Sequence, residues 1–220
     1  MEQDEKYIKD LEETVSKFMK PLKNVPFSVI IKALSGYSVV VFDRKDKKDI
    51  ELLKRLSKGL AIATRTANTK GIFSGRPNEV GNHIEPFVRD ALNRIGMKAH
   101  VPTTGGGKHK AAGYPDVEIE DVDRRITYLE CKTYNLKSED SSFRSFYFQP
   151  STDFKITSDA RHLLVGFEIK KEKRNGKEAY VPISWHLYTL DKLHVQVKYE
   201  FNASNRELYV KEALLAEGKV

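Results

Sequence analysis

The chain has little cysteine and no long apolar segment. Cys131 is the single cysteine among 220 residues, which excludes a disulfide within the chain and a cysteine-rich metal site. Such cysteine usage is typical of a reducing cytoplasm. No run of about 18 apolar residues occurs, so no membrane span is predicted. Because residues 1–24 are charged throughout and lack the apolar core of a signal peptide, we expect a cytoplasmic protein.

The composition is rich in basic side chains. The chain carries 38 Lys and Arg against 31 Asp and Glu, with a formal net charge of +7 and a sequence pI of about 9.2. An excess of cations favours a polyanionic partner, because each Lys or Arg at a phosphate releases condensed counterions. A lysine-rich solvated surface would give the same composition, so charge alone leaves both readings open. The length fits one domain, or a core domain with a small appendage.

Three segments in the N-terminal half have apolar residues at helical spacing. The first includes Ile8 to Leu22, with Pro21 and Pro26 marking its end, and the others are 46–66 and 78–95. Residues 37–42 fit a short strand or a buried connection. Pro86 should kink the third helix or mark a second start. The breaker-rich stretch 70–77 indicates a soft boundary between an N-terminal helical region, residues 1–75, and residues 76–220, the two forming one compact unit.

The pattern then changes from helices to strands. Asn175-Gly176 is a strong hairpin signal between two strand-like runs, 162–170 and 180–190. A turn at 121–125 should join two further strands, and 205–219 could form a closing helix. Other strand patterns end at 100–101 or cover 117–119, 126–133, 143–148 and 193–201. Helices followed by strands predict an α/β (α+β) fold with a central mixed β-sheet flanked by helices.

The triplet Glu130-Cys131-Lys132 lies in one of these predicted strands. Side chains in a strand alternate between faces, so Glu130 and Lys132 should share a face and Cys131 should point to the opposite side. A glutamate binds a hard cation through oxygen, and the neighbouring lysine can orient a water or offset the charge of a phosphate. A triplet of this kind is also common on exposed strands, so by itself it is a weak signal.

Asp116 supplies a second carboxylate fourteen residues upstream of Glu130. Pro115 sets the backbone before it, and Gly113 allows a close approach of the chain. Phosphodiester hydrolysis needs a metal that activates water and stabilises the developing charge. Asp116, Glu130, the backbone carbonyl of Cys131 and water could surround Mg²⁺ octahedrally.

With Pro115-Asp116, thirteen intervening residues and then Glu130-Cys131-Lys132, the sequence resembles the PD-(D/E)xK nuclease superfamily, and Type II restriction endonucleases in particular. The resemblance covers about residues 76–170. It implies a restriction-endonuclease-like core and Mg²⁺-dependent cleavage that leaves 5′-phosphate and 3′-hydroxyl ends, with Mn²⁺ able to substitute. It makes Asp116 and Glu130 the metal ligands and Lys132 the water-orienting base or electrostatic partner. Residues 76–220 would then be the catalytic core, and residues 1–75 would dimerise or grip DNA.

The resemblance also implies an acidic residue on the helix before the core strands. Gly81-Asn82-His83-Ile84-Glu85 fits the Gly-x-x-x-Glu pattern of many members, which makes Glu85 a further site candidate. Pro86 directly after it departs from the expected helix, and Glu79 is the competing candidate. A carboxylate that complements the helix dipole is the alternative reading of Glu85.

Two segments are candidates for DNA contacts. The glycine-rich, basic loop 103–112 precedes Asp116 and is expected to be flexible, with backbone amides and cations suited to phosphate. Segment 135–151 follows the site strand and offers groups for base edges. A surface loop and core packing of the aromatic side chains are the respective alternatives. The candidate residues are Thr103, Thr104, Lys108, Lys110, Lys137, Arg144, Ser145, Tyr147 and Gln149.

These observations favour a sequence-specific Type II restriction endonuclease of a prokaryotic cytoplasm acting on double-stranded DNA. A homodimer is expected, because a palindromic duplex site mirrors a two-fold axis. Functional pairing with a DNA methyltransferase follows from the same reading. A structure-specific nuclease, such as a junction resolvase or repair enzyme, is the first alternative, and a non-catalytic DNA-binding domain is the second.

Overall fold

The computed structural model describes residues 2–18, 20, 22–74, 80–108, 113–135 and 153–197, and the isolated positions 204, 206 and 216. The chain divides into two compact units, Pro26–Leu193 and a smaller one that combines Met1–Val25 with His194–Val220. The boundary expected near residues 75–76 falls at the undescribed residues 75–79. Among the described residues, no helix combines the length and apolar character that a membrane span requires.

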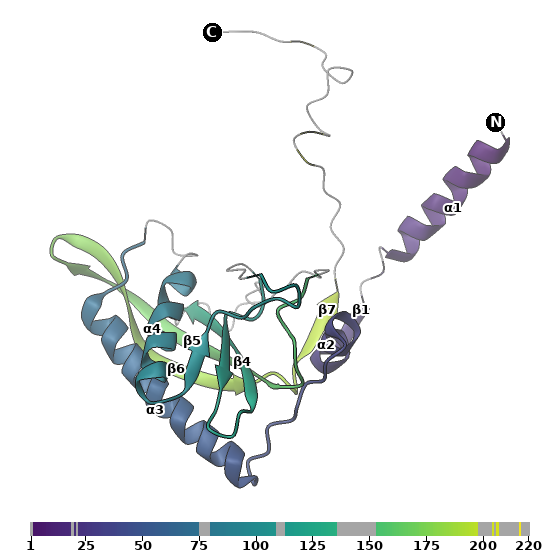
Figure 1. Cartoon of the computed structure of the whole chain (residues 1–220). Coiled ribbons are helices and arrows are strands. Elements are labelled where there is room, and N and C mark those ends of the chain that lie inside the picture. Colours follow the sequence, from purple (N-terminus) through teal and green to yellow (C-terminus); the bar gives the residue numbers. More distant parts are fainter. Residues whose placement is uncertain are drawn as a thin grey trace. The chain divides into compact units, whose positions relative to one another are not determined.

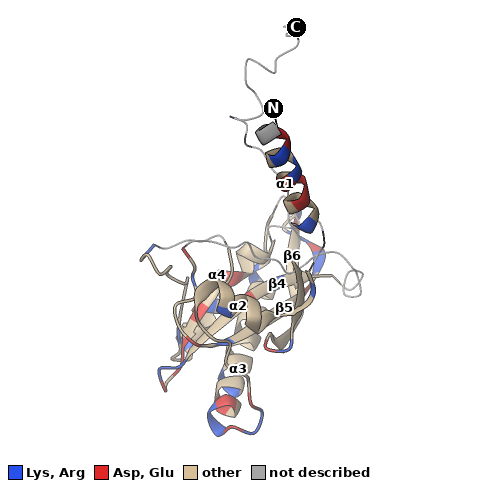
Figure 2. Cartoon of the chain, turned by 90° about the vertical axis from the view of Figure 1, so that its right-hand side faces the viewer, with Lys and Arg blue, Asp and Glu red and all other residues tan. Residues whose placement is uncertain are grey.

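The smaller unit contains helix α1 (Glu2–Phe18) and a two-stranded sheet of β1 (Leu22–Pro26) and β7 (His194–Val197). Basic and acidic side chains are interspersed along α1 (Figure 2). The predicted first helix is confirmed up to Phe18, but its continuation to Leu22 is wrong. Pro21 explains the early end, because proline cannot continue the helical hydrogen bonding and disfavours helix in the residue before it. The strand pattern of 193–201 is confirmed for His194–Val197.

The larger unit is built on a five-stranded sheet with the order β2-β3-β4-β5-β6. Figure 1 labels β4, β5 and β6 of this sheet. Neighbouring strands are antiparallel except β4 and β5, which run parallel, so the sheet is mixed as predicted. Asn175 and Gly176 adopt positive φ angles of 51° and 76° at the predicted hairpin tip. The strands are β2 (Lys98–His100), β3 (Val117–Glu120), β4 (Ile126–Tyr134), β5 (Arg161–Arg174) and β6 (Lys177–Thr189).

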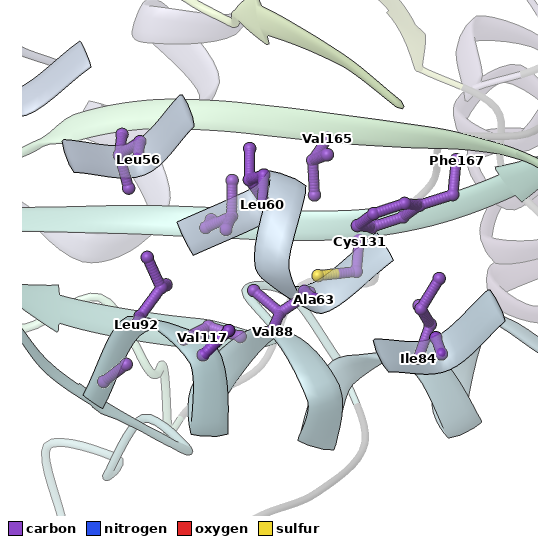
Figure 3. Packing of buried hydrophobic residues seen from close by; sticks show 14 of the residues in the cluster. Leu56, Leu60, Ala63, Ile84, Val88, Leu92, Val117, Cys131, Val165 and Phe167 are labelled. Carbon is purple, nitrogen blue, oxygen red and sulfur yellow. The ribbon is translucent and has the colours of Figure 1, made fainter. Parts of the chain in front are cut away.

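Helices α3 (Lys47–Lys70) and α4 (Val80–Arg94) pack against each other, α3 against β6 and α4 against β2 and β4. Their apolar stripes meet the sheet residues in one buried cluster, which confirms the helical periodicity read from the sequence (Figure 3). Cys131 points into this cluster, as strand alternation predicts. The labelled members include Leu56 and Leu60 of α3, Val88 and Leu92 of α4, and Val117, Cys131, Val165 and Phe167 of the sheet.

Two local features differ from the sequence reading. Helix α4 passes through Pro86, so the expectation of a second start there is wrong. Ile84 and Val88, both fully buried, anchor the helix on either side of the proline. Helix α2 (Phe27–Ser35) was not predicted, and it ends at Gly36 with a φ of 79°. Of the two readings left open for residues 37–42, the structure shows a connection, with an isolated bridge from Val39 to Ala160.

Candidate active site

Strand β4 brings Glu130 and Lys132 to the same face of the sheet, as the alternation of side chains predicts. Lys132 Nζ lies 2.5 Å from Glu130 Oε1 and donates a hydrogen bond to it. The glutamate is only 3% exposed, whereas the lysine side chain retains 32% exposure. The pair therefore places a buried carboxylate beside an ammonium group that solvent still reaches.

Asp116 joins this pair from the position directly before β3. The antiparallel register matches Val117 with Leu129, which brings Asp116 next to Glu130 in the neighbouring strand. Asp116 Oδ2 accepts a hydrogen bond of 2.8 Å from the backbone N–H of Cys131. Two carboxylates separated by fourteen residues in the sequence are thus fixed together by the pairing of β3 and β4.

The electrostatics of the three groups reflect their crowding. Burial, reinforced by repulsion from Asp116 and opposed by Lys132, raises the pKa of Glu130 to about 7. Burial also raises the pKa of Asp116, although the Cys131 amide and Lys132 oppose the rise. Burial lowers the pKa of Lys132, but the attraction of Glu130 and Asp116 outweighs it, so the net shift is upward. The site thus crowds two carboxylates around the Lys132 ammonium group.

Helix α4 contributes Glu85 to the same electrostatic cluster. Burial and repulsion from Asp116 raise the pKa of Glu85 to about 7, with a smaller contribution from Glu130. Arg89 lies one helical turn further on, with Nη1 3.7 Å from Glu85 Oε2, and opposes the rise. The structure therefore brings Glu85 to the site, while the competing candidate Glu79 lies outside the described residues.

The oxygen atoms of this cluster fit a hard divalent cation. Glu130 Oε2 is buried and has no hydrogen-bond partner among the described residues. A buried carboxylate oxygen without a partner is costly unless a cation or a donor compensates it. No three His, Cys, Asp or Glu side chains in the described part of the chain converge on one point. A cation held by Asp116 and Glu130 would thus need a backbone carbonyl, for which Cys131 stays the predicted donor, and water.

The described part of the glycine-rich loop, residues 103–108, contains a hydrogen-bonded turn. Thr104 N donates to Lys108 O at 2.9 Å, and Thr104 Oγ1 accepts from Lys108 N at 3.1 Å. Gly106 N donates to Asp153 Oδ1 at 2.9 Å. Thr104 is 3% exposed, and its hydroxyl holds the turn, while its contact with DNA stays a prediction. Lys108 is exposed and Thr103 is half-buried.

The remaining predicted DNA contacts cannot be placed, because they lie outside the described residues. They are Lys110, Lys137, Arg144, Ser145, Tyr147 and Gln149.

Sequence reasoning missed one charged residue beside the site. Lys155 is 3% exposed, and its Nζ donates to the carbonyl oxygens of Gly113 at 2.6 Å and Pro115 at 2.9 Å. Its partners lie 42 and 40 residues away. A lone lysine between Phe154 and Ile156 carries no motif, so no sequence signal could have found it.

A mixed sheet flanked by helices, with two carboxylates and a lysine gathered at β3 and β4, defines a restriction-endonuclease-like α+β protein. The model of the Type II restriction enzyme MjaV family matches residues 21–212. The chain is 38% identical over 229 residues to the Type II restriction enzyme MjaV of Methanocaldococcus jannaschii, with 97% of each chain covered. No solved structure gives a significant match. The chain belongs to the MjaV family of Type II restriction enzymes.

Proposed function

We propose that this chain is a Mg²⁺-dependent, sequence-specific endonuclease that hydrolyses both strands of double-stranded DNA and leaves 5′-phosphate ends. Membership of a Type II restriction enzyme family supports the substrate and the site-specific cleavage. One observation carries the proposed chemistry: Asp116 and Glu130 are held together beside Lys132, and Glu130 presents a buried oxygen that lacks a described partner.

The two carboxylates would hold the cation, with the Cys131 carbonyl as a further oxygen ligand. A divalent cation bound there would lower the pKa of a water and offset the charge that develops on the phosphate. Mg²⁺ suits an all-oxygen site that retains several waters, and Mn²⁺ accepts the same ligands. Glu85, whose carboxylate is coupled by repulsion to Asp116 and Glu130, would join the site directly or through a water.

Lys132 acts in this proposal as a fixed positive charge rather than as a base. Its pKa is raised because Glu130 and Asp116 outweigh the effect of burial, so the side chain is an ammonium group at neutral pH. An ammonium group donates hydrogen bonds but cannot accept a proton. It can therefore orient the attacking water through that water's lone pair and stabilise the charged phosphate.

The partners follow from the family and from the charge. A Type II enzyme that acts on a palindromic site is expected to be a homodimer, because the symmetry of the protein then matches that of the DNA. Exposed Lys108, near Asp116 in sequence, remains a candidate phosphate contact. A cell that carries such an enzyme needs its own sites protected, so a DNA methyltransferase of the same specificity is the expected functional partner.

The test is cleavage of unmethylated phage DNA by the purified protein in Mg²⁺, in Mn²⁺ and in EDTA, beside a Lys132→Ala variant. We expect discrete bands in either metal and none in EDTA, with cleavage by the variant reduced about a hundredfold or more, as for loss of one charge-stabilising donor. Lys98→Ala is the matched control, because Lys98 is 2.7 Å from Glu120 in another lysine–glutamate pair of the sheet, away from the carboxylate cluster. The control should cut at the wild-type rate.

Four results would contradict the proposal at different levels. Cleavage by Lys132→Ala at the wild-type rate would show that the assigned active site is wrong. Cleavage of branched but not of linear duplexes would indicate a structure-specific nuclease, and tight binding without cleavage would indicate a DNA-binding domain. Fragments that a ligase joins only after treatment with a 5′-kinase would show that the 5′-phosphate assignment is wrong.

A further inference from the structure

Lys155 is a buried lysine on the connection that leads into β5. Lysine is among the residues least often buried, because removing an ammonium group from water is costly unless several acceptors surround it. Here the side chain is 3% exposed, and Nζ donates to two backbone carbonyls. A hydrogen bond to a charged donor contributes more than one between neutral groups. The burial of Lys155 therefore indicates that it has a structural role in holding these two carbonyl groups.

The two carbonyls belong to the backbone that delivers Asp116. Gly113 lies three residues before Asp116, and Pro115 lies directly before it. One ammonium group therefore binds the backbone on both sides of Tyr114. Gly113 has a φ of 88°, a conformation that only glycine adopts readily. Beyond Asp116 the chain enters β3, and the Asp116 carboxylate is tied to the Cys131 amide. The aspartate is thus fixed from both sides.

The charge of Lys155 also faces the acidic cluster. It opposes the rise in the pKa of Asp116 and of Glu85 that their burial causes. Lys155 and Lys132 therefore both favour ionised carboxylates, but they differ in access. Lys132 is partly exposed and can contact a substrate, whereas Lys155 is buried and donates two hydrogen bonds to the protein backbone.

We propose that Lys155 is a positioning residue of the active site, whose ammonium group clamps the Gly113–Pro115 backbone and so holds the Asp116 carboxylate where it binds the divalent cation. This inference rests on the proposed function of the site. Lys155 does not touch the DNA in this assignment, and it acts through Asp116.

The sign of one measurement separates positioning from simple charge. Well above pH 7, where the carboxylates of Glu130 and Glu85 are ionised, a lysine that merely sat near a bound cation would repel it, so removing the lysine would tighten cation binding measured at that pH. A lysine that orders a metal ligand does the reverse, because partners that orient ligands typically contribute about 10- to 100-fold in metal affinity. The Mn²⁺ affinity of a neutral variant should therefore fall, although one positive charge has been removed.

We would measure Mn²⁺ binding by isothermal titration calorimetry in the absence of DNA, for the wild type, Lys155→Met and Lys155→Arg. Lys155→Met keeps much of the side-chain length without the charge and should bind Mn²⁺ about tenfold or more weakly. Lys155→Arg keeps charge and donors and should recover most of the loss. Tyr128→Phe is the matched control, because the Tyr128 hydroxyl accepts a 2.9 Å hydrogen bond from Thr157 N on the same connection. It should lower the melting temperature and leave Mn²⁺ affinity unchanged.

Two further measurements complete the experiment. The single-turnover cleavage rate at saturating Mg²⁺ should fall in Lys155→Met, while DNA affinity in Ca²⁺ stays at the wild-type value. If Lys155→Met does not fold, Lys155→Gln, which keeps an amide donor but no charge, should show a smaller loss of the same sign. Unchanged or tighter Mn²⁺ binding in the folded neutral variant would overturn the inference. A wild type that binds Mn²⁺ but never cleaves DNA would instead count against the proposed function.

Discussion

At the scale of single residues, His162 is a histidine that the fold keeps neutral. It is 1% exposed, and burial lowers its pKa from the ordinary 6.5 to about 3. The Tyr114 hydroxyl hydrogen-bonds to Nδ1 at 2.7 Å, and Nε2 has no partner among the described residues. The rings of Phe27, Tyr114 and Tyr128 surround it. A proton added to this ring would therefore be a buried charge without compensation.

This burial predicts a loss of stability in acid. Between pH 6.5 and about 3, the unfolded chain takes up a proton at His162 that the folded chain does not. Above pH 6.5, His162 is neutral in both states and does not lower the free energy of unfolding. Below pH 6.5, its protonation in the unfolded chain lowers the free energy of unfolding by about 1.4 kcal/mol per pH unit. Urea unfolding from about pH 7 to about pH 4.5 should show a smaller acid slope for His162→Gln than for the wild type. His83→Gln, at an exposed position of α4, is the control, and equal slopes for all three proteins would refute the prediction.

The predictability of single residues depends on whether their partners are close in sequence. Asp116, Glu130 and Lys132 could be chosen in advance, because strand alternation and a short spacing define their geometry. Asp49 could not: it is fully buried and receives Arg125 Nη1 at 2.8 Å and Arg161 Nη2 at 2.6 Å, both from far along the chain. Burial raises the pKa of Asp49, but the Asp43 amide and these arginines outweigh burial and lower it overall. Long-range charge pairs of this kind leave no local pattern.

At the scale of elements, the contact between α3 and α4 depends on a glycine. A Cβ atom at Gly59 of α3 would lie 2.5 Å from Leu92 Cδ2, closer than real Cβ atoms approach, and 3.3 Å from Ile95 Cδ1, which is a tight contact. Leu92 is fully buried and belongs to the core, so it has little room to move. The glycine therefore lets the two helices pack closely, at the cost of helix propensity.

Substitution of this glycine should have the opposite effect to the usual one in a helix. Replacing glycine by alanine in a helix interior generally stabilises by up to about 1 kcal/mol. At Gly59 we expect a net destabilisation of about 1 to 2 kcal/mol, because overpacking the core destabilises the protein by more than the higher helix propensity of alanine stabilises it. Gly81→Ala in α4 is the matched control, since among the described residues its Cβ would meet only Thr133 Oγ1, at 3.9 Å. Denaturant midpoints should move in opposite directions for the two variants, and a stabilised Gly59→Ala would contradict this account of the interface.

Elements with long periodic patterns were predictable, and short ones were not. Helices α3 and α4 repeat their apolar residues over several turns, and the β5–β6 hairpin has an Asn-Gly turn, so local signals agree with the fold. Helix α2 has nine residues and little polar surface to reveal a period. Its place is set instead by Phe27, which packs against Tyr114 and His162 from distant parts of the chain. The path of the chain through Pro86 was likewise decided by packing on both sides.

At the scale of the whole molecule, the proposed homodimer makes a prediction about strand cleavage. If each subunit cuts one strand of a palindromic site, a dimer with one inactive subunit should nick the duplex without completing the second cut. Wild-type and Lys132→Ala chains carrying different tags can be co-expressed and the mixed species purified through both tags. On a supercoiled plasmid with one site, this species should accumulate open circles, whereas the wild type proceeds to linear product.

The control is a mixed species of wild-type and Lys98→Ala chains, which should linearise the plasmid as the wild type does. Failure to recover any species through both tags would argue for a monomer, because a stable homodimer must form both like and mixed pairs. If the enzyme cut the two strands in turn as a monomer, the wild-type chains in a mixture with Lys132→Ala chains would still linearise the plasmid, and open circles would not persist. Lasting nicks that depend on the mixed pairing would place one Asp116–Glu130–Lys132 site on each strand, which joins the geometry of β3 and β4 to the symmetry of the substrate.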